Sequence, residues 1–229
     1  NQVNLKDLPS AGFQFKSDHE TVLSRQIAFG YSAEDLKFVM APMVGDATES
    51  TGSMGNDTPL AILSQKPQLL FNYFKQLFAQ VTNPAIDSIR EELVMSMEIT
   101  LGKERNLLAE SPEHCRKLKI EHPILTGHEM EKIRGLNQSD LKTAVLPILF
   151  SASEGQAGLK EALDKLCQQA SQAIEEGATI LILSDKGMDV NNVPIPSLLA
   201  TAGVHHHLLR EQTRTQVGLV VETGEAREM

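Results

Sequence analysis

The sequence is short of three features that would assign it to a common class of protein. It has 2 cysteines in 229 residues, too few for a disulfide framework and too far apart for a paired-cysteine zinc site. No apolar run approaches the roughly 20 residues that a membrane-spanning helix needs. Acidic residues outnumber basic ones by 30 to 21, so the formal charge is −9 and a nucleic-acid backbone is repelled. These shortages favour a cytoplasmic protein that binds neither nucleic acid nor membranes.

The rest of the composition is that of an ordinary globular protein. Hydrophobic residues make up 41% of the chain and charged residues 22%, and a chain of this length buries roughly 70% of its unfolded surface. The sequence begins with Asn1 and carries no charged-then-apolar leader. We therefore expect a piece cut from a longer protein.

Residues 1 to about 110 predict a helical segment with one unusual loop. Ser32 and Asp35 have the spacing of a capping box, and the helix that they begin is expected to stop at Pro42. Residues 45–57 are rich in glycine and asparagine, which indicates a loop. Thr58 and the proline after it are expected to restart a helix.

Two more helices are expected in this half. Apolar residues between Leu70 and Phe78 recur at helical spacing. Asn83 followed by Pro84 is a typical start for another helix, which is expected to run through Leu101.

From about residue 117 to 225, predicted strands and helices alternate. Such alternation is typical of an α/β fold with a parallel sheet. Proline cannot donate to a sheet ladder, so Pro123 and Pro147 predict edge or interrupted strands. The predicted elements are a strand at 144–150, a helix at 159–174 stopped by Gly177, a strand at 179–183, a helix at 197–211 and a strand at 216–221.

Motifs of common enzymes and nucleotide-binding proteins are missing. The sequence has no GxGxxG turn, phosphate loop, GxSxG elbow, HExxH helix or Asp/Asn-rich calcium loop. Gly52 and Gly55 come nearest to a phosphate-binding turn. No lysine and no predicted strand accompany them, so we interpret this segment as a turn-rich loop.

Three adjacent histidines, His205 to His207, are the first candidate for metal or proton chemistry. Consecutive helical residues point about 100° apart, so three neighbouring imidazoles cannot converge on one ion. We favour packing or hydrogen bonding, with His205 and His206 beside a core face of Leu198, Ala202 and Leu209. Metal or proton chemistry is the alternative.

The second candidate is Ser184 to Gly187, at the carboxyl end of a predicted strand. Ligands of α/β folds bind at such ends, but any loop there needs polar turn residues. We favour the second explanation. Cys115 and Cys167 are assigned no chemical role; Cys167 lies on the exposed edge or core margin of its helix and lacks an evident activating base.

Several segments together resemble the central domain of the large subunit of glutamate synthase, or of its ferredoxin-dependent form. The resemblance covers most of the chain in order and has one departure, Ser88, where the family usually has proline. The segments are Gln26–Tyr31 with Glu34–Leu36, Thr51–Ser64, Tyr73–Asp87, Ile182–Asp185, Pro194–Leu199, Val204–His207 and Glu222–Glu228.

The resemblance implies that residues 1–229 are one part of an enzyme. In the family, a glutaminase domain releases ammonia and a flavin-mononucleotide (FMN) barrel with an iron–sulfur cluster converts 2-oxoglutarate and ammonia into glutamate. The central domain joins these two partners in one polypeptide and is related to a rudimentary, incomplete flavin-binding TIM barrel. We therefore expect no catalytic, cofactor-binding or metal-binding residue and no enzyme activity in this fragment, and a location in the cytoplasm or, for a plant-type enzyme, the plastid stroma.

The resemblance further implies that this domain forms part of the wall of an ammonia tunnel. A tunnel must keep ammonia from bulk water, so neutral or apolar groups that can move are expected in its lining. The candidates are Met54, Asp57, Thr58, Thr82 and Asn83. The alternatives are an ordinary loop for Met54 and a helix cap for Thr82 and Asn83.

Two rival functions remain open at this point. One is a self-standing partial barrel that binds flavin or phosphate and has its own oxidoreductase activity. The other is a histidine metal-binding module.

Overall fold

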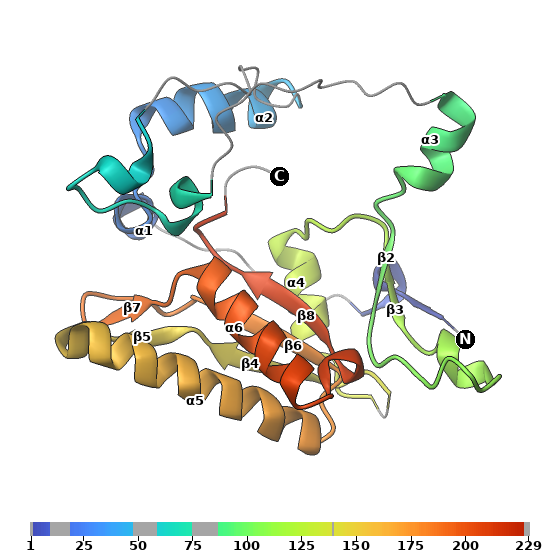
Figure 1. Ribbon diagram of the computed structural model, residues 1–229. Helices are drawn as coiled ribbons and strands as arrows, with labels where there is room; N and C mark the ends of the chain where they lie inside the picture. The colour runs from blue at the N-terminus through green and yellow to red at the C-terminus, as the bar shows by residue number, and fades with distance from the viewer. Residues whose placement is uncertain (1, 10–18, 48–58, 75–86, 139, 227–229) are drawn as a thin grey trace. The chain divides into compact units, whose positions relative to one another are not determined.

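The computed structural model describes residues 2–9, 19–47, 59–74, 87–138 and 140–226 (Figure 1). The chain forms two units. Unit 1 comprises Asn1–Lys16 and Met95–Thr223, and unit 2 comprises Ser17–Val94 and Gly224–Met229. Within the described ranges, no helix combines the length and the apolar character that crossing a membrane requires.

A three-stranded parallel sheet lies at the centre of unit 1. Its strands are β4 (Thr143–Pro147), β6 (Ile180–Ser184) and β8 (Gly218–Glu222), in the order β4-β6-β8. Helices α5 (Gly155–Glu175) and α6 (Ser197–Arg210) connect them. Both strand pairs are parallel and in register over five residues. The predicted α/β class with a parallel sheet is therefore confirmed.

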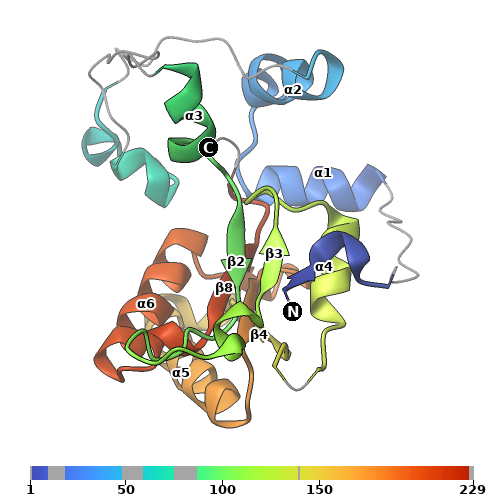
Figure 2. The same cartoon turned by 90° about the vertical axis from the view of Figure 1, so that its right-hand side faces the viewer.

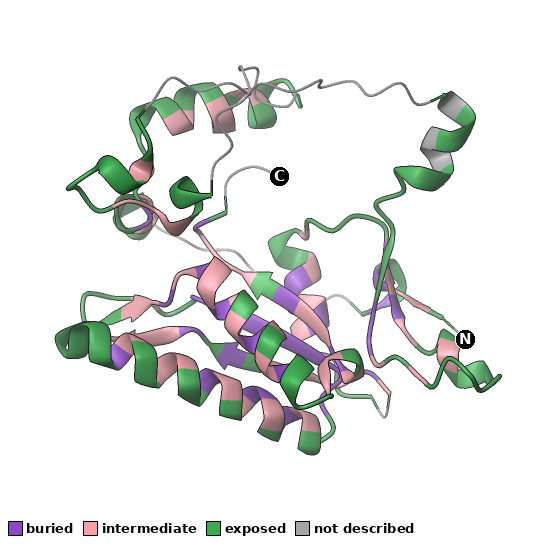
Figure 3. Cartoon of the chain, viewed as in Figure 1, coloured by how far each residue is buried: buried purple, intermediate pink, exposed green. Residues whose placement is uncertain are grey.

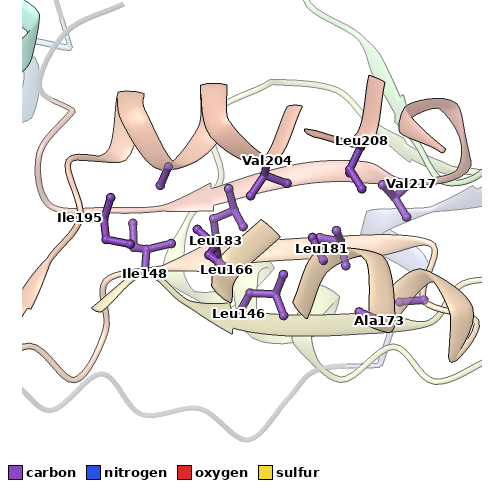
Figure 4. Packing of buried hydrophobic residues seen from close by; sticks show 13 residues of the cluster. Leu146, Ile148, Leu166, Ala173, Leu181, Leu183, Ile195, Val204, Leu208 and Val217 are labelled. Atoms are coloured by element: carbon purple, nitrogen blue, oxygen red, sulfur yellow. The ribbon is translucent and has the colours of Figure 1, made fainter. Parts of the chain in front are cut away.

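The central strand β6 is buried on both faces. Leu181 and Leu183 point into a core shared with α5 and α6, whereas Ile180 and Ile182 belong to a second core on the opposite face. Successive strand residues point to opposite faces of a sheet, so one continuous apolar run serves both cores. Figure 4 shows the first core, whose buried members are Leu146, Ile148, Leu166, Ala170, Ala173, Ala178, Leu181, Leu183, Ile195, Ala200, Val204, Leu208 and Val217.

Helix α6 buries a different face from the predicted one. Its buried row is Ala200, Val204 and Leu208, while Ala202 and Leu209 are exposed. Gly203 explains the rotation: a Cβ there would lie 2.8 Å from a Leu163 methyl carbon. Without a side chain at Gly203, α6 approaches α5 along this side, and the neighbouring row then faces the sheet.

The second core lies between the parallel sheet, a small three-stranded sheet and helix α4 (Gly127–Arg134). The small sheet contains β1 (Val3–Asn4), β2 (Ile99–Leu101) and β3 (Leu118–Ile120) in the order β1-β3-β2. Figure 2 shows β2, β3 and α4 from their own side. The buried members of this core are Leu5, Leu8, Leu101, Leu118, Ile120, Met130, Ile133, Leu136, Leu141, Ile180, Ile182 and Val220.

Pro147 interrupts the strand predicted at 144–150, as expected. The run divides into β4, which ends at Pro147, and β5 (Leu149–Ser151), which pairs with β7 (Asn192–Pro194) in a separate antiparallel ribbon. Between them, the Ile148 N–H donates to the Ser184 carbonyl. Unit 1 also has 3₁₀ turns at Leu5–Asp7, Pro112–Cys115, Ala152–Glu154 and Arg214–Gln216.

The described part of unit 2 is built from short helices. The capping box is confirmed, because Ser32 and Asp35 exchange side-chain-to-backbone hydrogen bonds of 2.8 and 3.1 Å. The expected stop at Pro42 is wrong. A six-residue π-helix runs from Asp35 to Met40, and α2 (Ala41–Gly45) continues through the proline. At the end of the π-helix the Ala41 N–H donates to the Leu36 carbonyl, and Pro42, which has no N–H, follows as the second residue of α2.

The helix predicted to run through Leu101 is present from Ser88 to Val94, but its predicted end is wrong. Helix α3 (Ser88–Val94) is capped by Asp87 and ends seven residues before Leu101, which is buried in β2. Pairing of β2 with β3 overrides the local helical spacing. The other described helices of unit 2 are α1 (His19–Ala28) and the 3₁₀ turns Ala61–Leu63 and Leu70–Tyr73.

Two predicted helices lie only partly within the described residues. Pro59 and Leu60 are not helical, so the restart expected after Thr58 is reduced to the turn Ala61–Leu63. The helix expected from Leu70 is a 3₁₀ turn as far as Tyr73. Residues 75–86 lie outside the described residues.

Gly177 ends α5 and provides a test of this fold. Its φ is +90°, and Gly177 and Ala178 donate to the carbonyls of Ile174 and Ala173, as in a Schellman motif. We expect Gly177→Ala to lower the free energy of unfolding in urea by about 1–2 kcal/mol. Gly135→Ala is the control, because Gly135 has φ −78° and room for a Cβ. An equal loss in both variants would contradict this role for the left-handed conformation.

Candidate functional site at the carboxyl end of the parallel sheet

Polar side chains gather where β6 and β8 end. Ser184 and Glu222 are the last residues of these strands and are partners in register. Helix α4 contributes Glu131 and Arg134 from its last turn, and Lys186 follows β6 in the loop. Because parallel strands end at the same edge, residues far apart in the sequence meet here.

Glu222 is the centre of this cluster. Arg134 donates from Nη2 to both of its carboxylate oxygens, at 2.9 and 2.8 Å. The Ser184 hydroxyl donates to Oε2 of Glu222 and accepts the Lys186 backbone N–H at 3.2 Å. Ser184 thus links the loop after β6 to the end of β8.

Glu131 completes the cluster. Its Oε1 accepts from Arg134 Nε at 3.3 Å and from Lys186 Nζ at 3.4 Å, and Lys186 Nζ lies 3.9 Å from Glu222. Two carboxylates thereby neutralise two cations. The Arg134, Glu131 and Glu222 side chains are 17–24% exposed, against 50% for Lys186. The ionic groups of the cluster are engaged with one another.

The environment of Glu222 keeps it ionised. Burial by itself raises the pKa of Glu222, but the hydrogen bonds from Ser184 and Arg134 and the charges of Arg134 and Lys186 outweigh it. The pKa of this carboxyl therefore lies below its usual value. A carboxylate of lowered pKa is a weak general base, so it is poorly suited to activating Ser184 as a nucleophile.

The ionic cluster is better suited to holding α4, β8 and the loop after β6 together than to binding a phosphate. A flavin phosphate binds best to backbone N–H groups or to cations that it does not share with a carboxylate. Here Glu131 and Glu222 flank both Arg134 and Lys186. The residues present do not fit a flavin phosphate, and loop structure, the favoured explanation for Ser184 to Gly187, agrees with these contacts.

Asp185 belongs to the same edge and is deeply buried. Asp185 is 1% exposed, and its backbone N–H donates to the Glu222 carbonyl at 3.1 Å. Its own carbonyl accepts the Met188 N–H at 3.3 Å. The turn after β6 is thus held by backbone bonds as well as by the ionic cluster.

The three histidines make separate contacts on α6. His207 Nε2 lies 2.8 Å from the Ser171 hydroxyl of α5, and Arg214 Nε donates to His205 Nδ1 at 2.9 Å. His206 stacks edge-on against His205. Hydrogen bonding, which the sequence favoured, is therefore present at His205 and His207. No group of three His, Cys, Asp or Glu residues with metal-binding geometry occurs within the described part of the chain.

The two cysteines lie in different surroundings. Cys115 is exposed at the end of a 3₁₀ turn. Cys167 is half-buried on α5, where burial and the charge of Asp164 raise the pKa of its thiol. A raised pKa reduces the thiolate fraction and with it the reactivity.

The candidates for a tunnel wall, Met54, Asp57, Thr58, Thr82 and Asn83, all lie outside the described residues. Conversely, sequence reasoning did not single out Glu131 and Arg134 of α4. A capping box of Thr126 and Glu129 marks the start of that helix and is the one sequence signal that could have located it.

The fold and the site together define an α/β domain in which ion pairs occupy the carboxyl edge of the parallel sheet. In a comparison with known protein families, residues 24–229 match the family described as the glutamate synthase central domain. The chain belongs to this family.

Curated relatives extend the match to nearly the whole chain. Glutamate synthase [NADPH] large chain of Bacillus subtilis is 46% identical over 208 residues, 91% of this chain and 13% of the relative. Glutamate synthase [NADH] of Schizosaccharomyces pombe is 43% identical over 215 residues, which are 93% of this chain and 10% of the relative. The chloroplastic ferredoxin-dependent glutamate synthase of Oryza sativa is 44% identical over 229 residues, and the match covers 98% of this chain and 14% of the relative. The chain therefore spans about a tenth to a seventh of these relatives.

The ionic cluster predicts how the domain responds to substitution and to acid. Glu222→Gln should lower the free energy of unfolding by about 1–3 kcal/mol at neutral pH, because Arg134 loses its bidentate partner. The lowered pKa of Glu222 stabilises the fold above its unfolded value of about 4.3, and this contribution is lost as pH falls through the folded value. The acid-induced loss of stability should therefore be smaller in the variant than in the wild type.

Urea unfolding at several pH values measures both effects. Glu121→Gln is the control, because Glu121 pairs with Lys6 on the surface, where the side chains are 42% and 67% exposed. Its substitution should leave the free energy of unfolding nearly unchanged. Equal responses of the two variants would show that Glu222 has no special role.

Proposed function

We propose that this chain is the noncatalytic central domain of a glutamate synthase. In the intact polypeptide it links a glutaminase domain to an FMN-binding synthase domain and forms part of the wall of the tunnel that carries ammonia between them. The parent enzyme is an oxidoreductase that makes glutamate from glutamine and 2-oxoglutarate. The observation that carries this proposal is the family match over residues 24–229, in relatives of which this chain spans only 10–14%.

The chemistry of the described residues supports a connecting role. In α/β folds the carboxyl edge of the sheet is where catalytic groups are usually found. In this chain that edge holds Arg134 and Lys186 against Glu131 and Glu222, and Ser184 against Glu222. Side chains tied to one another stiffen the edge and leave little capacity for binding a substrate.

The sheet topology supports kinship with a rudimentary TIM barrel. Strands β4, β6 and β8 are neighbours in the sheet, follow one another in their order along the chain and are parallel, and α5 and α6 pack on the same face. A TIM barrel places every helix on the outer face of its sheet, whereas a doubly wound fold uses both faces. The two helices that connect the strands thus lie as in such a barrel, whereas α4, on the opposite face, has no counterpart in one.

The proposed cofactors of the parent enzyme, FMN and an iron–sulfur cluster, belong to other domains. Iron–sulfur clusters are usually held by four cysteine thiolates, and this chain has 2 cysteines. The parent enzyme is proposed to act in the cytoplasm, or in the plastid stroma if it is of the plant type. The Oryza sativa relative is named as chloroplastic.

The tunnel wall is proposed to include Met54, Asp57, Thr58, Thr82 and Asn83. Ammonia that meets bulk water becomes ammonium, so its passage needs neutral groups and exclusion of solvent. Methionine is flexible enough to act as a movable plug, and hydroxyl or amide groups can pass a neutral solute by hydrogen bonding. The four neutral residues of this set should therefore affect transfer between sites and not the chemistry at either site.

The experiment introduces bulk into the proposed tunnel of the full-length enzyme. Thr82→Phe and Met54→Trp should depress glutamine-dependent glutamate synthesis and leave synthesis from added ammonia comparatively unaffected. The measurement is the ratio of the two activities in each variant. The melting temperature is the control, because folding damage lowers both activities together. An unchanged ratio would remove these residues from the tunnel.

A further inference from the structure

Residues 59–74 of unit 2, named here the apolar segment, have a surface that is unusual for a segment facing water. Lys66 is its only charged residue. Six large apolar or aromatic side chains are exposed, by 37–75%: Leu60, Ile62, Leu63, Phe71, Tyr73 and Phe74. The green and pink colours of Figure 3 show how little of unit 2 is buried.

The polar side chains of the apolar segment bond to one another. Ser64 Oγ accepts from Gln68 Nε2 at 3.2 Å, and Gln68 Oε1 accepts from Asn72 Nδ2 at 3.1 Å. Ser64 Oγ also accepts the Lys66 backbone N–H at 3.1 Å. This chain of bonds ties the turn Ala61–Leu63 to the turn Leu70–Tyr73, and the two turns contact each other. The segment is therefore braced by its polar groups while its apolar groups face outward.

The described part of unit 2 buries almost nothing of its own. Among its residues whose side chains the structure describes, Phe29 and Glu225 are the only buried ones. Soluble monomers rarely expose large contiguous apolar patches, and such patches usually mark interaction sites. A preorganised apolar surface on a unit without a core in its described part points to a binding partner.

We propose that the apolar segment is a docking surface for another part of the same polypeptide, outside residues 1–229. This inference rests on the proposed function, in which the chain is one domain of a longer enzyme. The curated relatives are about seven to ten times longer than the matched segment, so most of the polypeptide is available to cover this surface. The partner surface is apolar and carries few charges, because Lys66 alone could pair with one.

Other occupants fit the residues less well. Membrane-surface helices combine apolar residues with many lysines and arginines, whereas the apolar segment has Lys66 alone and the chain has a net charge of −9. A second copy of the chain offers an equally apolar surface, but it is not covalently linked and would need a larger contact area to bind stably. A covalently linked partner has a high effective concentration, so a modest apolar surface suffices to hold it.

The test is site-specific photo-crosslinking in the intact polypeptide. Ile62 and Phe74, which are 75% and 74% exposed, are each replaced by p-benzoylphenylalanine. Gln168, an exposed residue of α5, is replaced in a control variant. After irradiation, the cross-linked peptides are identified by mass spectrometry, and the mass of the chain is checked on a denaturing gel.

The proposal predicts cross-links from positions 62 and 74 to peptides outside residues 1–229, at the mass of a single chain and several times more abundant than from position 168. Cross-links to a second copy, to lipid or to residues within 1–229 would overturn it, as would a yield no greater than that of the control. The activity ratio of the tunnel variants is measured separately, so failure of the docking surface and failure of the proposed function are distinguishable.

Discussion

Burial of β6 on both of its faces is the constraint on which the rest of unit 1 depends. Ile180 to Leu183 are completely buried, and each such side chain contributes about 1.5–3 kcal/mol when it leaves water. Both faces of the strand must therefore be covered. Helices α5 and α6 cover one face, and α4 with the β1-β3-β2 sheet covers the other. Elements from both ends of the chain are thus needed to cover the two faces of this one strand.

The same burial explains the polar edge. Ser184 ends the strand and Asp185 follows it, and these residues are only 3% and 1% exposed. Burying polar groups is costly unless they are hydrogen-bonded. Glu222 meets this requirement for Ser184, and Arg134 bonds to Glu222, so that these contacts link β6, β8 and α4. Unit 2 is the opposite case: it buries little in its described part and presents the apolar segment outward. One unit stabilises itself, while the other has the surface of a domain that is completed by a partner.

Sequence patterns predicted the elements with long periodic runs and missed those decided by tertiary contacts. Helices α5 and α6 and strands β6 and β8 lie within a few residues of their predicted bounds. Leu101 was assigned to a helix because its spacing is helical, but pairing with β3 makes it a strand. At the site, Ser184 could be found from its strand, whereas Arg134 and Glu222 are 88 residues apart and no local pattern connects them. The assignment of Met54 and Thr82 to a tunnel stays a prediction.

Native-state hydrogen exchange tests the central claim most directly. If β6 organises the domain, its amides from Ile180 to Ser184 should be among the slowest to exchange, together with their partners in β4 and β8, because they open only when both cores open. The amides of α1 and α2 should exchange much faster, since neither helix has a buried residue. Exchange of the β6 amides at the rate of those in α1 would contradict the account, because the strand could then open without disrupting either core.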